Sequence, residues 1–235
     1  MPAVSVKAGL SRSTEDYLKV IYELGAKGVP AHTSTLAAEL SVAPPSVSGM
    51  IKRLSESGLL EHAPYHGVEL TSAGRQAALG VLRRHRVLEA YLTNKLGYSW
   101  DTVHEEAERL EHAVSDVLIE RMALALNNPR FDPHGAPIPT EAGDMEEPES
   151  MPLTEVPVGS VALFSMVGDR EPERLRFIES LGLRPGVSFR VVAKQPFRGP
   201  VTIRIPGTAG SSDEVIGHEL AEGLSCTVVE ELDHA

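Results

Sequence analysis

The stretch TSTLAAELSVAPPSVSGMIKRLSESG, residues 33–58, decides the fold of the first part of this chain. Its opening segment places Leu36, Ala37 and Leu40 on one face of a short helix, because residues three and four positions apart share a helix face. The next five residues, SVAPP, predict a tight turn, and Pro45 suits the first turn of a second helix, where its missing N–H costs nothing. Two short helices joined by such a turn form a helix-turn-helix.

The second helix of this stretch is predicted to have a small, polar outer face. Val47, Ile51 and Leu54 have the helical spacing of an inner face, so the side chains between them point outward. Small and hydroxyl side chains let a helix approach DNA bases and phosphates closely, and the cationic pair that follows them offers phosphate contacts. We therefore predict that this helix binds DNA through Pro45, Ser46, Ser48, Gly49, Lys52 and Arg53.

The flanking sequence completes the order of a winged helix-turn-helix. A helix is predicted upstream over STEDYLKVIYELGAKG, residues 13–28, which has helically spaced apolar residues and ends at a glycine. Downstream, LLEHAPYHGVELT, residues 59–71, has short alternating runs around a Pro/Gly turn, which is typical of a two-stranded hairpin. The tip of this wing, at Tyr65 and His66, is expected to reach the DNA backbone. The alternative is a three-helix packing unit without DNA function, which the wing disfavours.

Beyond the wing, two further helices carry residues that bind metals. Residues 71–96 predict one long helix, and DTVHEEAERLEHAVSD, residues 101–116, predicts another. The second helix places a stripe of imidazoles and carboxylates within about 100° of one another, at 100° per residue. Its members are His104, Glu108, Glu111 and His112, and the first helix adds the i,i+4 pair His85 and Glu89. Two helices that each offer a His/Glu pair indicate a cation site; the alternative is a solvated acidic face.

A metalloenzyme with this cluster as its catalytic centre is a rival interpretation. His104 and Glu105 begin like the metalloprotease motif HExxH, but position 108 is Glu rather than His. The sequence also contains no nucleophile elbow and no phosphate-binding glycine loop. A winged-helix regulator that responds to an organic ligand is a second rival, which the two His/Glu pairs disfavour. We therefore predict no catalytic residue.

The second half of the chain changes character. Prolines are concentrated between Pro129 and Pro157, in a stretch too irregular for the interior of a helix or strand. The runs that follow are short, rich in Val, Ile, Phe and Thr, and separated by Gly and Pro, which predicts a small β-barrel of SH3-like size with one helical insert over residues 171–182. Cys226 lies in one of these runs and is expected to be buried, whereas His134 is interpreted as an ordinary surface residue.

Charge and composition narrow the class of protein. The net charge is −11, but residues 1–80 carry seven cationic and seven acidic side chains, so the acidic excess lies downstream of the winged helix. The sequence has neither an apolar run of membrane-spanning length nor the pattern of a secretory signal, so we expect a cytoplasmic protein. One cysteine excludes an internal disulfide and a multi-cysteine zinc site.

Together these blocks resemble the diphtheria toxin repressor family of metal-dependent transcriptional regulators, over nearly the whole chain. The resemblance rests on STEDYLKVIYEL, PPSVSGMIKRL, GLLEHAPYHGVELTSAGR, RRHRVLEAYL, VHEEAERLEHAVSD and LGLRPGVSF, in the family's usual order. It implies a mainly α protein with a C-terminal β-barrel. Its parts would be a winged helix-turn-helix (1–80), a helical metal-binding and dimerisation domain (81–146), a proline-rich linker (147–157) and an SH3-like domain similar to ferrous-iron-transport A proteins (158–235).

The resemblance also implies two metal sites. The primary site would comprise Asp16, Glu108, Glu111 and His112. The ancillary site would comprise His85, Glu89, His104 and Glu171. Lys19 stands where the manganese-responsive branch often has a metal-binding Glu, and Arg174 stands where iron-responsive members have a Gln ligand.

The family resemblance finally implies a function. Asp16 and Glu108 are similar to the manganese-responsive branch, whereas iron-responsive members carry Met and Cys there. Expected partners are Mn(II), with Fe(II) as the alternative and other divalent metals in vitro, a palindromic DNA operator, and a second copy of the chain. The expected role is repression of metal-uptake genes.

Overall fold

The computed structural model describes residues 10–63, 65, 67–146, 148–168, 170–207 and 210–230. The chain forms two compact units that interleave along the sequence. The N-terminal unit runs to His85 and takes in Glu111–Val114 and Pro139–Asp144, while the C-terminal unit takes in the remaining segments from Arg86 onward. The division of the chain at residues 80, 146 and 157 stays a prediction.

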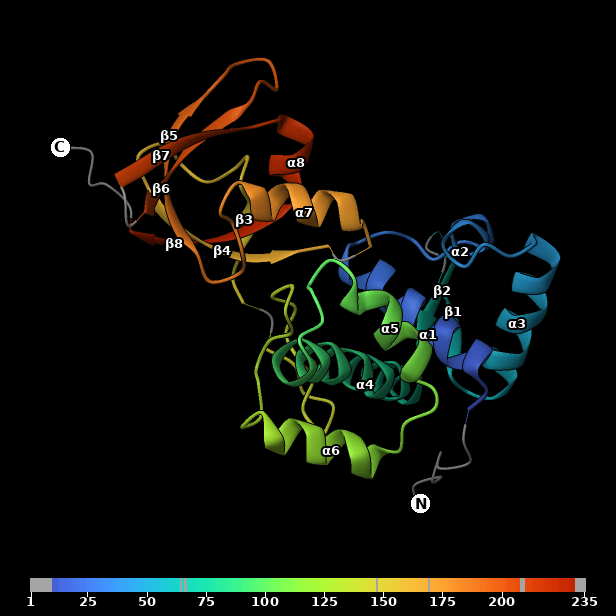
Figure 1. The fold of residues 1–235 in the computed structure, drawn as a ribbon. Helices are drawn as coiled ribbons and strands as arrows, with labels where there is room; N and C mark the ends of the chain where they lie inside the picture. The colour runs from blue at the N-terminus through green and yellow to red at the C-terminus, as the bar shows by residue number, and fades with distance from the viewer. Residues whose placement is uncertain are drawn as a thin grey trace. The chain divides into compact units, whose positions relative to one another are not determined.

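The N-terminal unit confirms the helix-turn-helix and its wing (Figure 1). Its elements are α1 (Arg12–Ala26), α2 (Thr33–Glu39), α3 (Pro44–Glu56), β1 (Leu60–Ala63), β2 (Gly67–Leu70) and the first part of α4 (Ser72–Leu96). Ser11 caps α1 by accepting a hydrogen bond from the backbone N–H of Thr14, and α3 begins with two prolines, where the first turn tolerates them. The proline in the first turn of α3 was expected, whereas the Ser11 cap starts α1 at Arg12, just before the predicted segment.

The core of this unit lies between its helices and the hairpin. Leu18 of α1, Leu36 of α2 and Val47 of α3 are completely buried. The hairpin meets the helices through Gly67, whose φ of +81° is a conformation that favours glycine. A Cβ on Gly67 would lie 2.4 Å from the carbonyl oxygen of Ala31, so only glycine allows this approach. The wing is thus held against the loop before α2.

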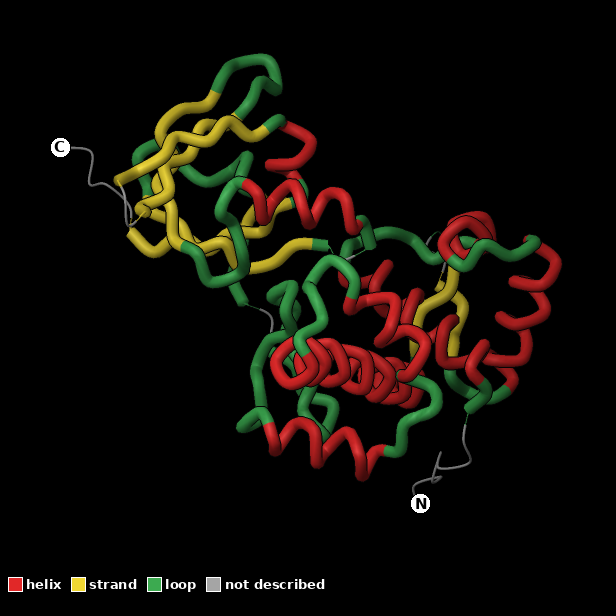
Figure 2. Tube along the Cα trace, in the orientation of Figure 1, coloured by secondary structure: helices red, strands yellow, loops and turns green. Residues whose placement is uncertain are grey.

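The C-terminal unit joins helices to an antiparallel sheet, and Figure 2 shows that nearly all strands of the chain gather there. Its helices after α4 are α5 (Val103–Leu110), α6 (Asp116–Ala125), α7 (Pro172–Ser180) and α8 (His218–Glu222). Its strands are β3 (Met151–Pro152), β4 (Val161–Val167), β5 (Ser188–Lys194), β6 (Val201–Gly207), β7 (Gly210–Ile216) and β8 (Leu224–Glu230). The helical insert is confirmed as α7, while α6, α8, β3 and β7 were not expected.

The strand order of the sheet is β3-β8-β4-β5-β6-β7. No pairing among the described residues joins β3 to β7, so the predicted β-barrel is confirmed only as an antiparallel β domain whose sheet is open. A two-residue β3 bonds only to β8 and is too short to close the sheet. Register shifts in β4 and β5 bend the strands instead.

One core serves the sheet and part of the helical region. Trp100, in the connection between α4 and α5, is fully buried in the same cluster as Phe164, Ile178 and Phe189. Its indole N–H donates to Glu179 Oε2 at 3.0 Å, so the polar atom of the buried ring is satisfied. The connection after α4 is therefore part of the β domain's core.

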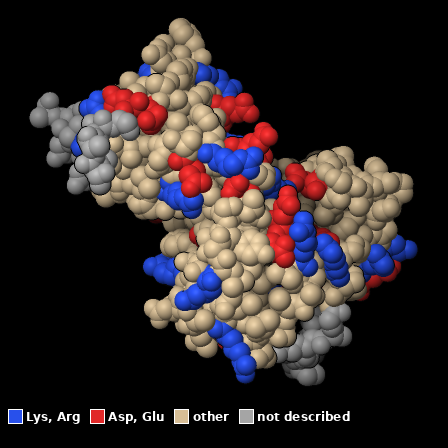
Figure 3. All heavy atoms as spheres, viewed as in Figure 1, with Lys and Arg blue, Asp and Glu red and all other residues tan. Residues whose placement is uncertain are grey.

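No helix among the described residues combines the length and apolar character needed to cross a membrane. On the face drawn in Figure 3, cationic and acidic side chains alternate and neither forms one continuous patch.

Candidate metal centres and nucleic-acid interface

The outer face of α3 has the exposure expected of a recognition helix. All six residues predicted on this face are exposed: Pro45, Ser46, Ser48, Gly49, Lys52 and Arg53. The inner face differs slightly from the prediction, since Met50 is buried beside Val47 and Leu54 while Ile51 is only half-buried. Lys52 lies 3.9 Å from Glu56 in a pair open to solvent, which leaves its ammonium available for a phosphate.

The wing tip presents an aromatic side chain. Tyr65 is 95% exposed and has a φ of +66°, an uncommon conformation for a residue with a side chain. His66, predicted to act beside Tyr65, lies outside the described residues. Tyr65 is therefore available to contact a partner of the winged helix.

The N-terminal unit brings together three of the predicted primary-site residues. Ligand atoms of Asp16, Glu111 and His112 all lie within 4.8 Å of one another. His112 Nε2 is 2.8 Å from Asp16 Oδ1 and 3.2 Å from Glu111 Oε1. Two carboxylate oxygens and an imidazole nitrogen are donors that suit Mn(II) and Fe(II). We call these three residues the primary group.

A neighbouring residue, Glu15, fixes which nitrogen of His112 faces Asp16 and Glu111, the other two residues of the primary group. Glu15 Oε2 lies 2.6 Å from His112 Nδ1, and since a carboxylate only accepts, Nδ1–H donates. Nε2 of the neutral ring is then an acceptor directed at two carboxylate oxygens, a contact that becomes favourable only with a cation or proton between them. This arrangement matches the carboxylate–histidine–metal triads of protein metal sites.

Glu15 was not predicted from the sequence, and Arg84 holds it in place. Arg84 Nη2 donates to Glu15 Oε1 at 2.5 Å, and its Nε donates to the backbone carbonyl of Glu111 at 2.9 Å. The side chains of Glu15 and Arg84 are only 14% and 16% exposed. The only signal in the sequence was the position of Glu15, next to Asp16.

Glu111 is a completely buried carboxylate with close partners. Lys19 Nζ donates to both Glu111 oxygens, at 3.1 and 2.9 Å, and His85 Nδ1 donates to Oε2 at 2.5 Å. Desolvation alone would raise the pKa of Glu111, but the hydrogen bond from His85 and the charge of Lys19 outweigh it and lower the pKa below its usual value. Glu111 is therefore ionised and ready to bind a cation at neutral pH.

The prediction that His104, Glu108, Glu111 and His112 share one helix face is wrong in part, because α5 ends at Leu110. Glu111 and His112 lie in the turn that follows, before Ser115 caps α6. His104 and Glu108 stay on α5 in the C-terminal unit, with His104 Nε2 3.8 Å from Glu108 Oε1. A role for Glu108 in the primary site stays a prediction.

The C-terminal unit contains a second, fully buried group. Ligand atoms of Glu89, Asp132 and His134 lie within 4.8 Å of one another, and all three residues are at most 6% exposed. Asp132 Oδ1 accepts from the backbone N–H groups of His134 and Ala136, at 2.8 and 2.9 Å. We call these three residues the buried group.

Hydrogen bonds orient the donors of the buried group toward one another. His134 Nε2 lies 2.6 Å from the carbonyl oxygen of Trp100 and must donate to it, so Nδ1 of the neutral ring faces Glu89 Oε2, 3.6 Å away. Glu89 Oε1 in turn lies 3.2 Å from His104 Nδ1. The interpretation of His134 as a surface residue was wrong: the Asp-x-His spacing around Pro133 was the signal that the sequence offered.

Two residues of the predicted ancillary site remain, His85 and Glu171. His85 lies in the N-terminal unit, where its bond to Glu111 leaves Nε2 as the acceptor of the neutral ring. Glu171 lies just before α7, is largely exposed, and pairs with Arg174 at 3.5 Å. The ancillary set of His85, Glu89, His104 and Glu171 therefore stays a prediction.

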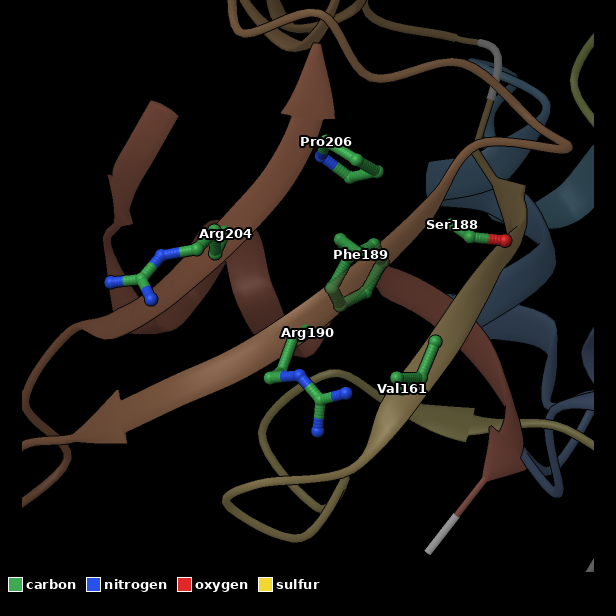
Figure 4. A pocket seen from close by; sticks show the side chains of 6 residues that line it. All are labelled: Val161, Ser188, Phe189, Arg190, Arg204 and Pro206. Atoms are coloured by element: carbon green, nitrogen blue, oxygen red, sulfur yellow. The ribbon is translucent and has the colours of Figure 1, made fainter. Parts of the chain in front are cut away.

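The β domain has a shallow cavity of about 260 Å³ over β4, β5 and β6 (Figure 4). It is lined by Val161, Ser188, Phe189, Arg190, Arg204 and Pro206. The protein itself engages both arginines, since Arg190 donates to the carbonyl of Gly159 and Arg204 binds Asp213 through two nitrogens. Their side chains extend in different directions, so they do not converge on one anion.

Three family models match the chain one after another. The iron dependent repressor N-terminal DNA binding domain matches residues 9–68, and the iron dependent repressor metal binding and dimerisation domain matches residues 71–140. The FeoA domain matches residues 151–228. Together they cover the helix-turn-helix, both candidate metal groups and the sheet.

Similar proteins cover nearly the full length. The iron-dependent repressor IdeR of Mycobacterium tuberculosis is 34% identical over 224 residues, which is 90% of this chain and 95% of that protein. The diphtheria toxin repressor of Corynebacterium glutamicum is 31% identical over 228 residues, covering 93% and 97%.

Two solved structures illustrate the similarity in three dimensions. A manganese-dependent transcriptional repressor in complex with manganese has a TM-score of 0.84 at 37% identity, covering 92% of this chain and all of that one. The manganese regulator SloR has a TM-score of 0.74 at 34% identity, covering 92% and 98%.

Proposed function

The chain belongs to the family of iron-dependent and diphtheria toxin repressors, and from this premise we propose that it is a metal-dependent transcriptional repressor that binds DNA as a homodimer. The observation that carries the proposal is the primary group, in which Nε2 of His112 faces the oxygens of Asp16 and Glu111. A divalent cation would supply charge neutralisation and a fixed link between these donors. The family membership indicates a regulator rather than an enzyme.

The primary group couples metal to the DNA-binding elements because its residues lie on different segments. Asp16 is on α1, which packs against α2 and β2, while Glu111 and His112 lie in the turn after α5. Joining these segments restrains the helix-turn-helix relative to the rest of its unit, and in a dimer it sets the spacing of two α3 helices. A bound metal would shift the population toward the DNA-competent state, and DNA would tighten metal binding by the same factor.

We propose the buried group as a second metal centre of this repressor. Glu89, Asp132 and His134 offer two carboxylates and an imidazole, fully withdrawn from water. Arg86 Nε, 3.8 Å from Asp132 Oδ2, and the two backbone N–H donors offset part of the cost of burying these carboxylates, and a divalent cation would offset more of it. The exchange Asp132→Asn should lower the number of Mn(II) ions bound per chain while leaving the primary group filled.

We propose Mn(II) as the physiological metal, with Fe(II) as the alternative. The donors of both groups are oxygen and nitrogen, without the sulfur that favours softer ions. One similar structure is described as a manganese complex, and ScaR, another similar repressor, as a cadmium or zinc complex. Because Mn(II) binds weakly in the divalent series, its preference has to come from coordination geometry rather than affinity. Asp16→Met combined with Glu108→Cys should move activation toward Fe(II).

The proposed DNA site is the exposed face of α3 with the wing tip, and the operator is palindromic to match a two-fold dimer. A repressor of this kind acts on the chromosome, so the cytoplasm is the proposed location.

Exchanging Lys52 and Arg53 for Ala should weaken DNA binding and reduce the slope of log affinity against log salt by about one per lost phosphate contact. An unchanged slope in the folded double variant would show that α3 is not part of the DNA interface.

The decisive experiment measures binding to the DNA upstream of the protein's own gene at buffered free Mn(II), Fe(II) and Zn(II), under anaerobic conditions. His112→Ala should abolish metal-stimulated binding while the protein stays folded. His218→Ala, which removes an imidazole outside both groups, is the matched control and should behave as wild type. Metal-dependent hydrolysis of a phosphoester or peptide, lost in His112→Ala, would instead support an enzyme.

A further inference from the structure

Lys19 lies within contact distance of the primary group and is almost fully buried. Its side chain is 6% exposed, and its ammonium contacts both oxygens of Glu111. A Lys ammonium is strongly hydrated and almost never fully buried without a partner. We propose that Lys19 is a resident cation of the metal centre, which holds the Glu111 carboxylate when no metal is bound and limits the centre to one divalent ion.

The charged side chains in contact around the primary group support one ion rather than two. Glu15, Asp16 and Glu111 contribute three negative charges, and Lys19 and Arg84 contribute two positive charges, which leaves a net charge of −1 with neutral imidazoles. One divalent ion changes this to +1, and a second would change it to +3. Like charges a few ångströms apart repel strongly where water is excluded, so the second ion is disfavoured.

The contacts of Glu111 lead to the same conclusion. Oε2 accepts from Lys19 at 2.9 Å and from His85 at 2.5 Å, so both of its lone pairs are used. Among the described residues Oε1 accepts from Lys19 alone, at 3.1 Å, and it lies 3.2 Å from His112 Nε2. Glu111 therefore offers one oxygen to an ion beside His112. A second ion at Oε2 would have to displace a buried ammonium, which is costly.

An ordinary buried ion pair between Lys19 and Glu111 would behave differently. Removing one partner of such a pair destabilises the protein to the same extent with and without metal, because the metal plays no part in it. A resident cation shares its carboxylate with the metal. Removing its charge should therefore destabilise the metal-free protein, increase the stabilisation by metal, and tighten metal binding, since the bound ion is no longer repelled.

The test uses the full-length chain as wild type, Lys19→Met, Lys19→Arg and His112→Ala, with Mn(II) alone as the probe. Thermal unfolding is measured without and with Mn(II), and affinity and bound ions per chain are measured by calorimetry and elemental analysis. Lys19→Met should have a lower metal-free melting temperature, a larger rise with Mn(II), and affinity at this centre about tenfold tighter or more, equivalent to about 1.4 kcal/mol. Lys19→Arg retains the charge and should resemble wild type.

The inference rests on the proposed function, and the variants separate the two. His112→Ala should lose one Mn(II) per chain; a loss of two overturns the one-ion limit. Unchanged Mn(II) affinity and unchanged metal-induced stabilisation in Lys19→Met overturn the role of Lys19, as does a Lys19→Met chain that stays unfolded with Mn(II) present, because the metal then fails to replace the ammonium. If His112→Ala loses no Mn(II), the proposed metal centre itself fails, whatever the Lys19 variants do.

Discussion

Replacing Glu15 with Gln should weaken metal binding at the primary group although Glu15 is not one of its three donors. Glu15 accepts from His112 Nδ1 at 2.6 Å and from Arg84 at 2.5 Å, in a position where its side chain is 14% exposed. Glutamine retains the shape but removes the charge, and its amide can present N–H in place of an acceptor. The His112 ring is then free to turn or to take the other tautomer.

The magnitude follows from these two contacts. A hydrogen bond to an ionised carboxylate is about twice as strong as a neutral one, so the loss is about 1–2 kcal/mol at His112. Arg84 also keeps its charge after its carboxylate partner has gone, which disfavours a cation nearby. Both effects act against the bound ion, and together they predict a 10- to 100-fold loss of Mn(II) affinity, the range typical for outer-shell carboxylates.

The assay is competition for Mn(II) with a chelating dye, together with circular dichroism to verify the fold. Glu105→Gln is the matched control: this carboxylate also pairs with an arginine, Arg109 at 3.4 Å, but its side chain is 69% exposed. Exposed pairs contribute little, so the control should bind Mn(II) as wild type does. If folded Glu15→Gln binds Mn(II) within twofold of wild type, Glu15 does not orient His112 and the argument from its hydrogen bond is refuted.

Three further predictions concern stability and reactivity. Gly67→Ala should destabilise the N-terminal unit by about 1–3 kcal/mol or more in urea unfolding, because Gly67 has a positive φ and its Cβ would meet the Ala31 carbonyl. Gly80→Ala is the control: its Cβ would lie in open space on α4, so this exchange should stabilise the protein by up to about 1 kcal/mol. Burial raises the pKa of Cys226 to about 12, so a thiol reagent at pH 8 should modify it only after unfolding, and stability should decline as the pH rises above about 9 toward 12. Trp100→Ala should lower the free energy of unfolding by about 3–5 kcal/mol, so that the β domain no longer melts at the wild-type temperature but below it. A decrease of less than about 1 kcal/mol would show that the indole is not part of that core.

The helices of the DNA-binding part were predictable because their signals are local. Apolar residues at helical spacing, a serine cap and two prolines fix α1 and α3 within a few residues of the observed bounds, whatever the rest of the chain does. The polar outer face of α3 follows from the same periodicity. Glu111 and His112 were also readable as candidate donors from the His/Glu pattern, whereas Asp16 was implied by the family resemblance.

The partners of these donors depended on the tertiary structure. The family resemblance places Lys19 at a position that often binds metal, but no pattern in the sequence names its partner or that of Arg84. Only the fold brings these two cations to Glu111 and Glu15, which lie far away along the chain. The end of α5 at Leu110 could not be predicted either, because the residues of the following turn still fit a helical periodicity of about 100° per residue. How deeply a charged side chain is buried, and next to which partner, is a property of the folded chain.

The β domain divides in the same way. The sequence determined that it is made of short antiparallel strands, since alternation and turn residues act over a few positions. It did not determine that the sheet stays open, that Trp100 completes its core, or that His134 is buried beside Glu89. Those features arise from contacts between residues tens of positions apart, whose free energy depends on distances and exclusion of water that no local pattern encodes.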